Sequence, residues 1–395
     1  MNYIFFDDNF RQHLLPLTYT RPISDLRLGI LTIGEKWAKH LNASFSNITE
    51  DYLKQKFPAI IEGDNLLINS RLIPSTQLIE RITGLKTNEI LTSNNMVLAT
   101  RLTQNDVLEY METKKWKGQE IVYDFSFDFL KNTFDIFKKN EKEIAADFQL
   151  LTENRVSEKI SKTNNIAGAE NIFVEKGARI EFATINTTLG KVYIGKNAEI
   201  MEGALIRGSF ALCEGSTIKM GAKIYGPTTI GPFSKAGGEI NNVVIQGYTN
   251  KGHDGFLGNS VLGEWCNIGA DSNNSNLKNN YAEVRLWNYN TNNFAPTGLQ
   301  FCGLIMGDHS KCGINTMFNT GTVIGVSSNI FGTGFPRNFV PSFAWGGASG
   351  FIEYNFKKAI EVAALVMERR NLEFNAVDEA ILKAVFNISA QYRRF

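Results

Sequence analysis

The chain has few of the residues that would by themselves define a metal or disulfide protein. It contains four cysteines and four histidines in 395 residues, and no two cysteines form a CxxC pair. Cysteines scattered in this way give no recognisable zinc or disulfide framework. We therefore expect small buried thiols in a reducing compartment, with zinc ligation or disulfide bonding as the alternative.

Charge imbalance and long apolar runs are missing as well. The formal net charge is +1, and neither sign forms a block along the sequence. This balance argues against nucleic-acid binding and gives no electrostatic reason for membrane association. No apolar run approaches the length of a membrane-spanning helix, and the start, MNYIFFDDNF, lacks the basic residues of a secretory signal. We expect a cytoplasmic protein with neither kind of partner.

What the sequence does have is an aliphatic residue that returns every six positions. The series is Ile194, Ile200, Ile206, Leu212, Ile218, Ile224 and Ile230; it begins earlier at Val174 and Ile180 and resumes at Met306, Cys312, Phe318, Ile324 and Ile330. A period of six fits neither a helix nor a simple strand. It is typical of a hexapeptide-repeat parallel β-helix, in which three hexapeptides form one triangular coil and the aliphatic side chains stack inside.

The repeat divides the chain into three predicted domains. Residues 1–155 lack the repeat and have mixed α/β patterns, residues 156–350 carry it, and residues 351–395 have a helical apolar spacing. The β-helix is interrupted most widely from 237 to 303. We expect the C-terminal helices to cap its open end or to pack on a neighbouring subunit.

Local patterns place a few elements within the first domain. Short strands are expected at Tyr3–Phe6, Ala59–Ile61 and Leu66–Ile68. Helices are expected at Ile33–Leu41 and Asn132–Thr152. At the other end of the chain, the pair Asn375 and Asp378 is expected to begin a helix as a capping box.

Chemistry is expected where the repeat is interrupted, around His253. The histidine lies in the string NKGHDGFLG, in which Gly252 and Gly255 permit close approach of the backbone to a ligand. A lone histidine is more often structural than catalytic. However, an imidazole has an ordinary pKa of roughly 6.5, which suits proton transfer near neutral pH.

The surrounding motifs resemble a known enzyme family. Gly252-His253, Phe256-Leu-Gly258, Asn267-Ile-Gly-Ala270 and Asn276 follow the pattern of the acetyltransferase domain of the bifunctional glucosamine-1-phosphate N-acetyltransferase / N-acetylglucosamine-1-phosphate uridylyltransferase family. The strings GGEINNVVIQGYTNKGHDGFLG, SNLKNNY and GDHSKCGIN are similar to its archaeal and Bacteroidetes-type branch of sugar-1-phosphate nucleotidylyltransferase/acetyltransferases. The resemblance covers roughly residues 190–335.

The resemblance implies a left-handed β-helix that forms a homotrimer, with acetyl-CoA as cosubstrate and active sites between neighbouring β-helices. It also implies roles for individual residues. The general base is His253, the sugar is positioned by Glu239, Asn267 and Asn276, the sugar phosphate is bound by Lys251 and Lys278, and Ala270 lies beside the pantetheine arm. The Asn276 amide or backbone N–H groups stabilise the oxyanion.

Two departures from the family pattern concern the acceptor sugar. Phe256 stands where the family has a tyrosine, so one hydroxyl is missing from the sugar site. Asn241 or Asn242 stands where the family has a lysine, so one phosphate-binding charge is missing. The site asparagines also have a structural explanation, because asparagine tolerates the left-handed conformation found at β-helix corners.

The N-terminal domain carries a second resemblance. Leu14–Pro22, LLPLTYTRP, resembles the end of the sugar nucleotidylyltransferase signature, but both glycines of the preceding phosphate-binding loop are absent from FFDDNFRQH. Arg11 or Arg21 is the expected nucleotide ligand. Glu62-Gly-Asp64 resembles the motif whose aspartate holds Mg²⁺. The domain is short for this family, so a degenerate domain kept for binding or assembly is an alternative.

The function that we predict is acetyl transfer from acetyl-CoA to an amino-sugar phosphate, with glucosamine 1-phosphate as first choice, in UDP-N-acetylglucosamine synthesis. One alternative is a nucleotidylyltransferase that uses UTP or dTTP and Mg²⁺ and whose β-helix only assembles the oligomer. Another is a non-catalytic sugar-nucleotide-binding protein. Four aromatics near the interruption are expected to pack in the core or trimer, or to stack on adenine or sugar: Trp265, Trp287, Tyr289 and Phe294.

Overall fold

The computed structural model describes residues 1–395 and forms two compact units. Unit 1 comprises Met1–Leu14, Thr20–Leu26 and Leu31–Lys131; unit 2 comprises Leu15–Tyr19, Arg27–Ile30 and Asn132–Phe395. The division between these compact units falls at residues 131 and 132, ahead of the domain boundary predicted at residues 155 and 156. None of the helices combines the length and the apolar character needed to cross a bilayer.

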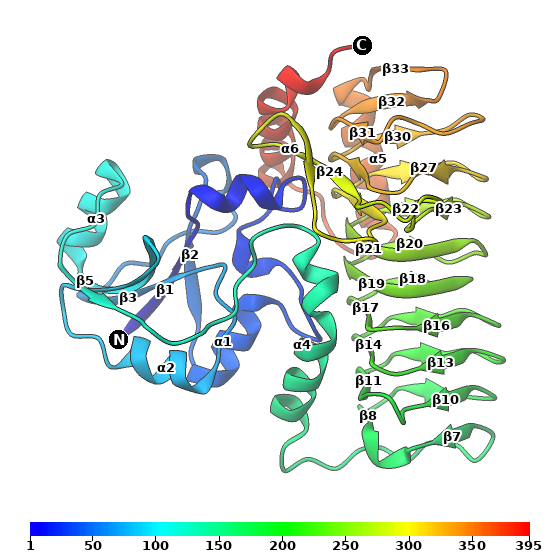
Figure 1. Ribbon diagram of the computed structural model, residues 1–395, viewed down its shortest axis with the longest axis horizontal. Helices are drawn as coiled ribbons and strands as arrows, with labels where there is room; N and C mark the ends of the chain where they lie inside the picture. Colours follow the sequence, from blue (N-terminus) through cyan, green and yellow to red (C-terminus); the bar gives the residue numbers. More distant parts are fainter. The chain divides into compact units, whose positions relative to one another are not determined.

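Unit 1 is the mixed α/β domain that the sequence predicts. Its six-stranded sheet has the order β2-β1-β3-β5-β4-β6, with β1 parallel to both β2 and β3. The strands are β1 Asn2–Phe6, β2 Phe45–Ile48, β3 Asp64–Asn69, β4 Glu89–Ser93, β5 Met96–Thr103 and β6 Gln119–Val122. The helices are α1 Ile33–Leu41, α2 Thr76–Thr83 and α3 Gln104–Thr113, with short 3-10 turns η1 Asn9–Leu14, η2 Ile23–Asp25 and η3 Asp51–Leu53. Figure 1 labels most of these elements.

Capping explains why one helix of unit 1 has the bounds that the sequence predicts. The hydroxyl of Thr32 accepts from the Glu35 amide while the Glu35 carboxylate accepts from the Thr32 amide, which satisfies the first turn of α1. The strand predicted at Ala59–Ile61 is wrong. Those residues have no ladder partner, and Ile60 is 58% exposed.

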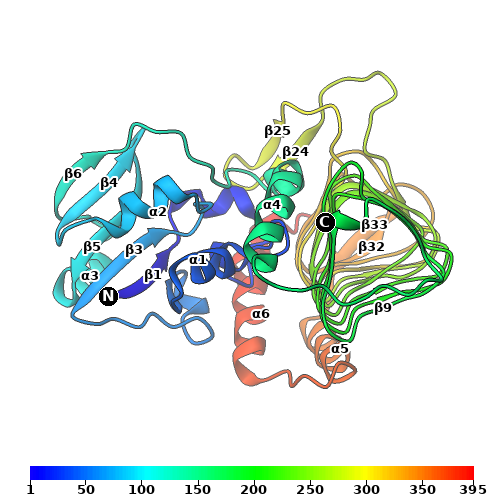
Figure 2. The same cartoon turned by 90° about the horizontal axis from the view of Figure 1, so that it is seen from below.

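Unit 2 is dominated by a left-handed parallel β-helix with three faces, seen end-on as nested triangles in Figure 2. The first face contains β7 Asn165–Ala167, β10 Thr184–Asn186, β13 Leu205–Arg207, β16 Lys223–Tyr225, the first halves of β19 Glu239–Gly247 and β21 Phe256–Glu264, then β23 Asn273–Asn274 and β28 Met317–Phe318. The second contains β8 Ile172–Val174, β11 Val192–Ile194, β14 Phe210–Leu212, β17 Thr228–Ile230, the second halves of β19 and β21, β26 Leu304–Met306, β29 Thr322–Ile324 and β31 Phe339–Val340.

The third face carries two-residue strands and ends in a hairpin. It contains β9 Arg179–Ile180, β12 Glu199–Ile200, β15 Thr217–Ile218, β18 Lys235–Ala236, β20 Asn250–Lys251, β22 Asn267–Ile268, β27 Lys311–Cys312, β30 Asn329–Ile330, β32 Ala344–Gly347 and β33 Gly350–Glu353. A short turn, η4 Ala169–Asn171, lies in the first coil. The last pair, β32 and β33, is antiparallel.

The residues of the six-residue series form one continuous buried core, as predicted. All of them, from Val174 to Ile330, are at most 5% exposed and belong to the same cluster. The core also continues through the segment predicted to interrupt it, with Ile240, Ile245, Leu257 and Leu262 inside. Steps of four and five residues replace the regular step there, so the coil continues although the period is lost. The excursion from the coil spans only 277–303 and contains the hairpin β24 Arg285–Asn288 and β25 Asn293–Pro296.

Polar contacts explain why α4, Asp135–Thr152, belongs to unit 2. The fully buried Asn140 accepts from the Gly29 amide (2.9 Å) and donates to the Pro227 carbonyl (3.0 Å). Asp147 of the same helix accepts from the Ile30 amide at 2.7 Å. Helix α4 and the segment Arg27–Ile30 are thus hydrogen-bonded to one another, and Asn140 joins them to the β-helix.

The C-terminal helices lie along the β-helix rather than over its end. They are α5 Phe356–Glu368 and α6 Ala376–Ile388, followed by η5 Ala390–Tyr392, and α6 begins with the predicted capping box. Arg370 reaches Asn250 of β20 at 3.0 Å, several coils before the end. The end of the core instead contains Phe351 of β33, which is 7% exposed. Helices α5 and α6 therefore pack along the side of the β-helix and do not form the cap over its end that the sequence predicted.

Candidate functional site

His253 lies at the corner between the third face and the first, in the turn that joins β20 to β21. Its side chain is exposed, and its imidazole makes no hydrogen bond. The turn is held close to the next coil because Gly255 has φ +112°, and a Cβ there would lie 2.2 Å from the Ser272 carbonyl oxygen. Only glycine fits this corner without a clash, so the backbone that carries His253 is tightly confined.

Lys251 lies beneath this turn and points into the β-helix. It is 1% exposed, and its Nζ donates to the carbonyl oxygens of Gly237 (3.0 Å), Asp254 (3.2 Å) and His253. Burial lowers the pKa of Lys251 to about 8. The ammonium has no surface from which to reach a sugar phosphate, so the structure contradicts the binding role predicted for Lys251.

Glu239 and Phe256 are register partners on the first face, next to the His253 corner. The hydroxyl of Tyr225 donates to the Glu239 carboxylate from the preceding coil. Burial, with the neighbouring Glu239, raises the pKa of Tyr225 to about 12, so the hydroxyl stays protonated. Asn241 is the register partner of Tyr225. Tyr225 thus supplies a hydroxyl near the place where Phe256 lacks one.

Sequence reasoning missed Tyr225, although a usable signal existed. Tyr225 follows the inward Ile224 by one position, and Asn241 follows the inward Ile240 by one. Stacking the coils on their inward residues would have aligned the two. The alignment depended on knowing that the step from Ala236 to Ile240 is four residues, which the sequence pattern does not reveal.

Asn276 lies at the opposite edge of the first face, in a ladder of asparagines. Its amide nitrogen donates to Asn259 Oδ1 at 2.7 Å. The Asn242 amide nitrogen donates to the carbonyl oxygens of Phe137 (3.1 Å) and Pro227 (3.3 Å). The Asn242 side-chain oxygen accepts from the Asn259 amide nitrogen at 3.0 Å. Asn242 and Asn259 have φ of 56° and 46°, which fits the corner role that the sequence left open for asparagine.

The predicted catalytic pair is not brought together within one chain. Asn276 contacts Asn259, which follows His253 along the strand β21 that crosses the first face. Six extended residues separate these two edges by up to about 20 Å. His253 and Asn276 are therefore at different corners.

The other predicted ligands are spread over neighbouring surfaces. Asn267 is exposed on the third face, between Asn250 and Lys311 of the adjacent coils. Ala270 is half-buried at the same corner as His253, one coil further on, where the Asp271 amide donates to the Asp254 carbonyl at 3.0 Å and the Ala270 carbonyl accepts from the Asn315 amide at 2.8 Å. Lys278 donates to the Glu283 carbonyl at 2.7 Å, inside the 277–303 excursion. None of the three forms a hydrogen bond with the imidazole.

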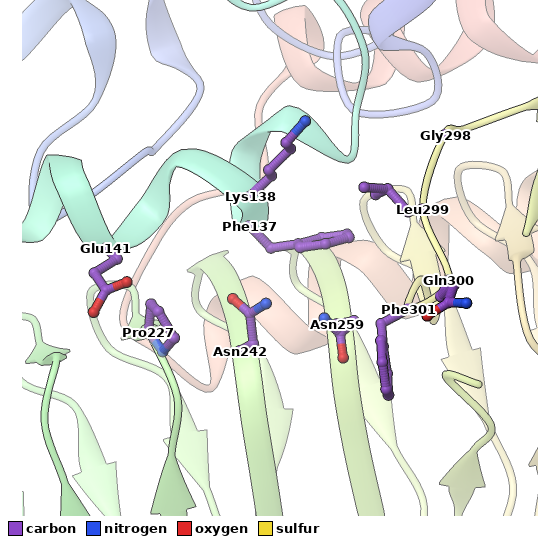
Figure 3. Close-up of a pocket in the computed structure, with 10 residues that line it drawn as sticks. All are labelled: Phe137, Lys138, Glu141, Pro227, Asn242, Asn259, Gly298, Leu299, Gln300 and Phe301. Atoms are coloured by element: carbon purple, nitrogen blue, oxygen red, sulfur yellow. The ribbon is translucent and has the colours of Figure 1, made fainter. Parts of the chain in front are cut away.

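A cavity of about 610 Å³ adjoins the asparagine ladder. Its lining residues come from α4, the corners and the 298–301 loop: Phe137, Lys138, Glu141, Pro227, Asn242, Asn259, Gly298, Leu299, Gln300 and Phe301. Figure 3 shows Asn242 and Asn259 on neighbouring strands beneath the Phe137 ring. Asn242, one of the two positions at which the resembled family has a lysine, lines this cavity, and Asn276 is joined to the cavity through Asn259.

The aromatic residues near the predicted interruption stack on one another. Trp265 is 7% exposed and stacks on Tyr248 (ring centroids 4.3 Å apart), which stacks on Phe233 (5.2 Å). Trp287 stacks on Phe339 at 4.1 Å and meets Phe294 edge-on at 5.5 Å. Tyr289 is 4% exposed. These rings therefore pack against other side chains of the protein, which was the first of the two roles predicted for them.

In unit 1, the predicted nucleotide-binding arginines are engaged by the protein itself. Arg11 pairs with Asp7 at 2.8 Å, directly after β1, and Asp7 also accepts from Thr49 at 2.6 Å. Arg21 is 7% exposed. The glycine loop of the resembled family is replaced by η1, so its backbone amides are not arranged as a phosphate cradle.

The predicted magnesium ligand Asp64 also has another partner. Arg101 donates to both Asp64 oxygens at 2.8 Å, and these hydrogen bonds lower the pKa of the carboxyl. No group of three or more His, Cys, Asp or Glu residues in the chain is arranged to hold a metal ion. Arg101 therefore competes with a metal ion for the Asp64 carboxylate, and the magnesium role of Asp64 stays a prediction.

Comparisons with known proteins agree with this arrangement. Residues 3–156 match the family model described as sugar nucleotidyl transferase. The bifunctional protein GlmU of Methanococcus aeolicus is 24% identical over 296 residues, which is 68% of this chain and 71% of that protein. GlmU of Methanocaldococcus jannaschii is 28% identical over 136 residues, 34% of this chain and 28% of that protein.

The similarity to solved structures is low, as one example shows. The UDP-N-acetylglucosamine acyltransferase from Campylobacter jejuni covers 60% of this chain and 83% of its own, at 13% identity and a TM-score of 0.27. This score is too low to carry an argument. Residues 3–156 are thus similar to a sugar nucleotidyl transferase domain, and a hexapeptide-repeat β-helix follows them in the same chain. More narrowly, about two thirds of the chain is similar to a bifunctional GlmU protein.

Proposed function

We propose that unit 2 is an acetyl-CoA-dependent N-acetyltransferase for an amino-sugar phosphate, with glucosamine 1-phosphate as the first candidate acceptor. The observation that carries this proposal is the exposed, unbonded imidazole of His253 on a confined corner. A free imidazole nitrogen accepts a proton, and a fixed backbone keeps it in place. The position of His253 in a GlmU-like chain supports this reading.

The proposed chemistry is acyl transfer without a metal. The neutral amine of the sugar attacks the thioester carbonyl carbon of acetyl-CoA, and a C–N bond forms. His253 accepts the proton that the nitrogen loses. The C–S bond then breaks, and the CoA thiolate leaves and takes the proton from the imidazolium. The oxyanion formed between these steps needs an N–H donor.

The acceptor is proposed to bind on the first face and its lower corner. The Glu239 carboxylate, held by Tyr225, is placed to accept hydrogen bonds from the sugar. Lys235 is exposed, lies beside Asn250 in register, and is the side chain nearest to Gly252. Lys235 therefore takes the phosphate-binding role that Lys251 cannot fill.

We also propose that the site is completed by a second copy, in a homotrimer. His253 and Asn276 lie at opposite edges of one face, so an Asn276 amide that serves the oxyanion has to come from a neighbour. Ala270, at the His253 corner of the next coil, and Asn267, on the third face, are then available to the pantetheine arm and the sugar.

The test is the release of CoA thiol by the full chain supplied with acetyl-CoA and glucosamine 1-phosphate. We expect turnover, and we expect His253→Ala to reduce kcat by about 100-fold or more, the usual contribution of a general base. Turnover that His253→Ala leaves unchanged would remove His253 from the chemistry. Absence of turnover with every amino-sugar phosphate and acyl-CoA would overturn the proposal.

A second candidate is nucleotidyl transfer by unit 1, favoured by the family match over residues 3–156. Pyrophosphate release from UTP or dTTP in the presence of a sugar 1-phosphate measures it directly. The Asp64–Arg101 and Arg11–Asp7 pairs argue for a weak or absent reaction. Turnover here that survives His253→Ala would establish a separate activity in the first unit.

A further inference from the structure

Lys251 is the one charged side chain in the apolar column of the third face. The inward positions of the neighbouring coils are occupied by Ile218, Ala236, Ile268 and Cys312, all at most 4% exposed. The register places Lys251 directly above Ala236. A charge taken into such an interior is costly unless it is fully hydrogen-bonded. Its presence therefore calls for an explanation in terms of what the ammonium holds.

The ammonium has three donors and three carbonyl partners. One is the oxygen of Gly237, at the same corner of the preceding coil, and the other two belong to His253 and Asp254. An ammonium carries no acceptor, so all of its hydrogen-bonding capacity is directed to backbone oxygens at one corner. The side chain joins the turn that carries His253 to the coil below.

We propose that Lys251 is a positioning residue that fixes the His253 turn from inside the β-helix and so orients the imidazole toward the reacting amine. The inference rests on the proposed acetyl transfer for its consequence in catalysis, but the anchoring itself is independent of that function. Asp254, Asp271 and Cys312 are the titratable groups that face the ammonium. The two carboxylates are exposed, and the thiol is buried.

A nearby lysine offers a matched control. Lys311 is a half-buried lysine of β27 on the same face, and burial lowers its pKa to about 8 as well. Its Nζ donates to the His309 carbonyl at 2.9 Å, at a different turn. The same substitution at the two lysines therefore removes an ammonium with a lowered pKa in each case, but it releases the His253 turn in only one.

The experiment compares Lys251→Met with Lys311→Met in the full chain. Amide hydrogen exchange of the peptide that contains residues 252–256 is measured first, because it does not depend on activity. We expect exchange to be about ten-fold faster or more in Lys251→Met and unchanged in Lys311→Met. Thiol release with glucosamine 1-phosphate is then expected to show kcat lowered by about 10- to 100-fold with KM nearly unchanged in Lys251→Met only.

The outcomes separate the inference from the proposed function. Unchanged exchange at 252–256 in Lys251→Met would overturn the inference. Faster exchange in a protein whose wild type has no turnover would keep the anchoring and reject the acetyltransferase. If Lys251→Met does not fold, Lys251→Gln replaces it. Its shorter side chain has only two donors for the three carbonyl oxygens, so exchange is still expected to be faster than in wild type, and equal exchange with a normal kcat would count against the anchor.

Discussion

The lysine proposed to bind the sugar phosphate is Lys235 and not Lys251. Lys251 is buried within the β-helix, whereas Lys235, one coil below, is exposed beside the His253 corner. A surface ammonium contributes to binding a phosphate but not to proton transfer. We expect Lys235→Met to raise KM for glucosamine 1-phosphate by about ten-fold, the equivalent of one charged hydrogen bond, with little change in kcat.

The control for Lys235→Met uses a second acceptor. Glucosamine without phosphate is offered at high concentration to wild type and variant, and the two are expected to use it equally well. Unequal use of the unphosphorylated sugar would show that Lys235 does not act through the phosphate, and an unchanged KM for the phosphorylated one would remove it from the site.

The sequence could predict which aliphatic residues point inward but not that Lys251 does. From Val174 to Ile230 the step is six almost throughout, and every predicted inward residue is buried. After Ala236 the inward residues are Ile240, Ile245 and Lys251, at steps of four, five and six. The two short steps break the six-residue count. From there on, the sequence alone does not show which residues point into the β-helix and which point outward.

At the scale of the element, the corner that carries His253 depends on one glycine. Gly255 combines φ +112° with a Cβ position 2.2 Å from the Ser272 carbonyl, whereas Gly332 has φ +98° and nothing within 4 Å. Gly255→Ala and Gly332→Ala thus share the dihedral strain, and only the first adds a clash. We expect Gly255→Ala to lose about 1–3 kcal/mol more unfolding free energy than Gly332→Ala, measured by urea titration.

Activity provides the second measurement on the same pair. Displacing the corner of Gly255 also displaces His253, so kcat for thiol release is expected to fall in Gly255→Ala and to stay near the wild-type value in Gly332→Ala. If both variants lose the same unfolding free energy, the steric confinement of the His253 turn is not a feature of the protein in solution.

Helix α4 illustrates what an element's own sequence leaves open. Its existence and its apolar residues were predictable from the helical spacing, and Phe137, Ile144 and Phe148 are buried. Its partner was not, because the contacts that bind it to unit 2 join residues that are distant in sequence. Asn140 bonds to Gly29 and Pro227 and Asp147 bonds to Ile30, while Ile144 and Phe148 pack in one cluster with Phe173 and Tyr193. Hydrophobic periodicity carries no information on such pairs.

At the scale of the whole molecule, the two units were predictable to different degrees. Stacking of identical coils makes the fold of unit 2 follow from the period of its sequence. The strand order β2-β1-β3-β5-β4-β6 of unit 1 comes from pairings between distant segments that no local pattern marks. The candidate site was predictable in part. His253 and Glu239 were identified from sequence motifs, whereas Tyr225 and Lys235 were identified only from the register of neighbouring coils.

The buried titratable groups of unit 2 give the molecule a specific alkaline stability profile. Burial lowers the pKa of Lys251 and Lys311 from 10.5 to about 8, so between these values the unfolded chain binds more protons and their contribution to the unfolding free energy rises with pH. Burial raises the pKa of Cys266 and Cys302 from 9.0 to about 12. Above pH 9 the unfolded chain therefore binds fewer thiol protons, and this contribution falls.

The opposite signs predict that the unfolding free energy rises from about pH 8 to pH 9, stays nearly level while the two thiols offset the two lysines, and declines above about pH 10 as the tyrosines also ionise in the unfolded chain. Tyr225, whose pKa is raised from 10.0 to about 12, adds to the decline above pH 10. Urea titrations at intervals from pH 7 to pH 11, followed by circular dichroism, measure the profile. Cys302→Ala is expected to flatten the alkaline limb, since it removes one of the groups responsible. A profile that falls steadily from pH 7, or an alkaline limb that Cys302→Ala leaves as steep as before, would mean that these side chains are not sequestered in solution.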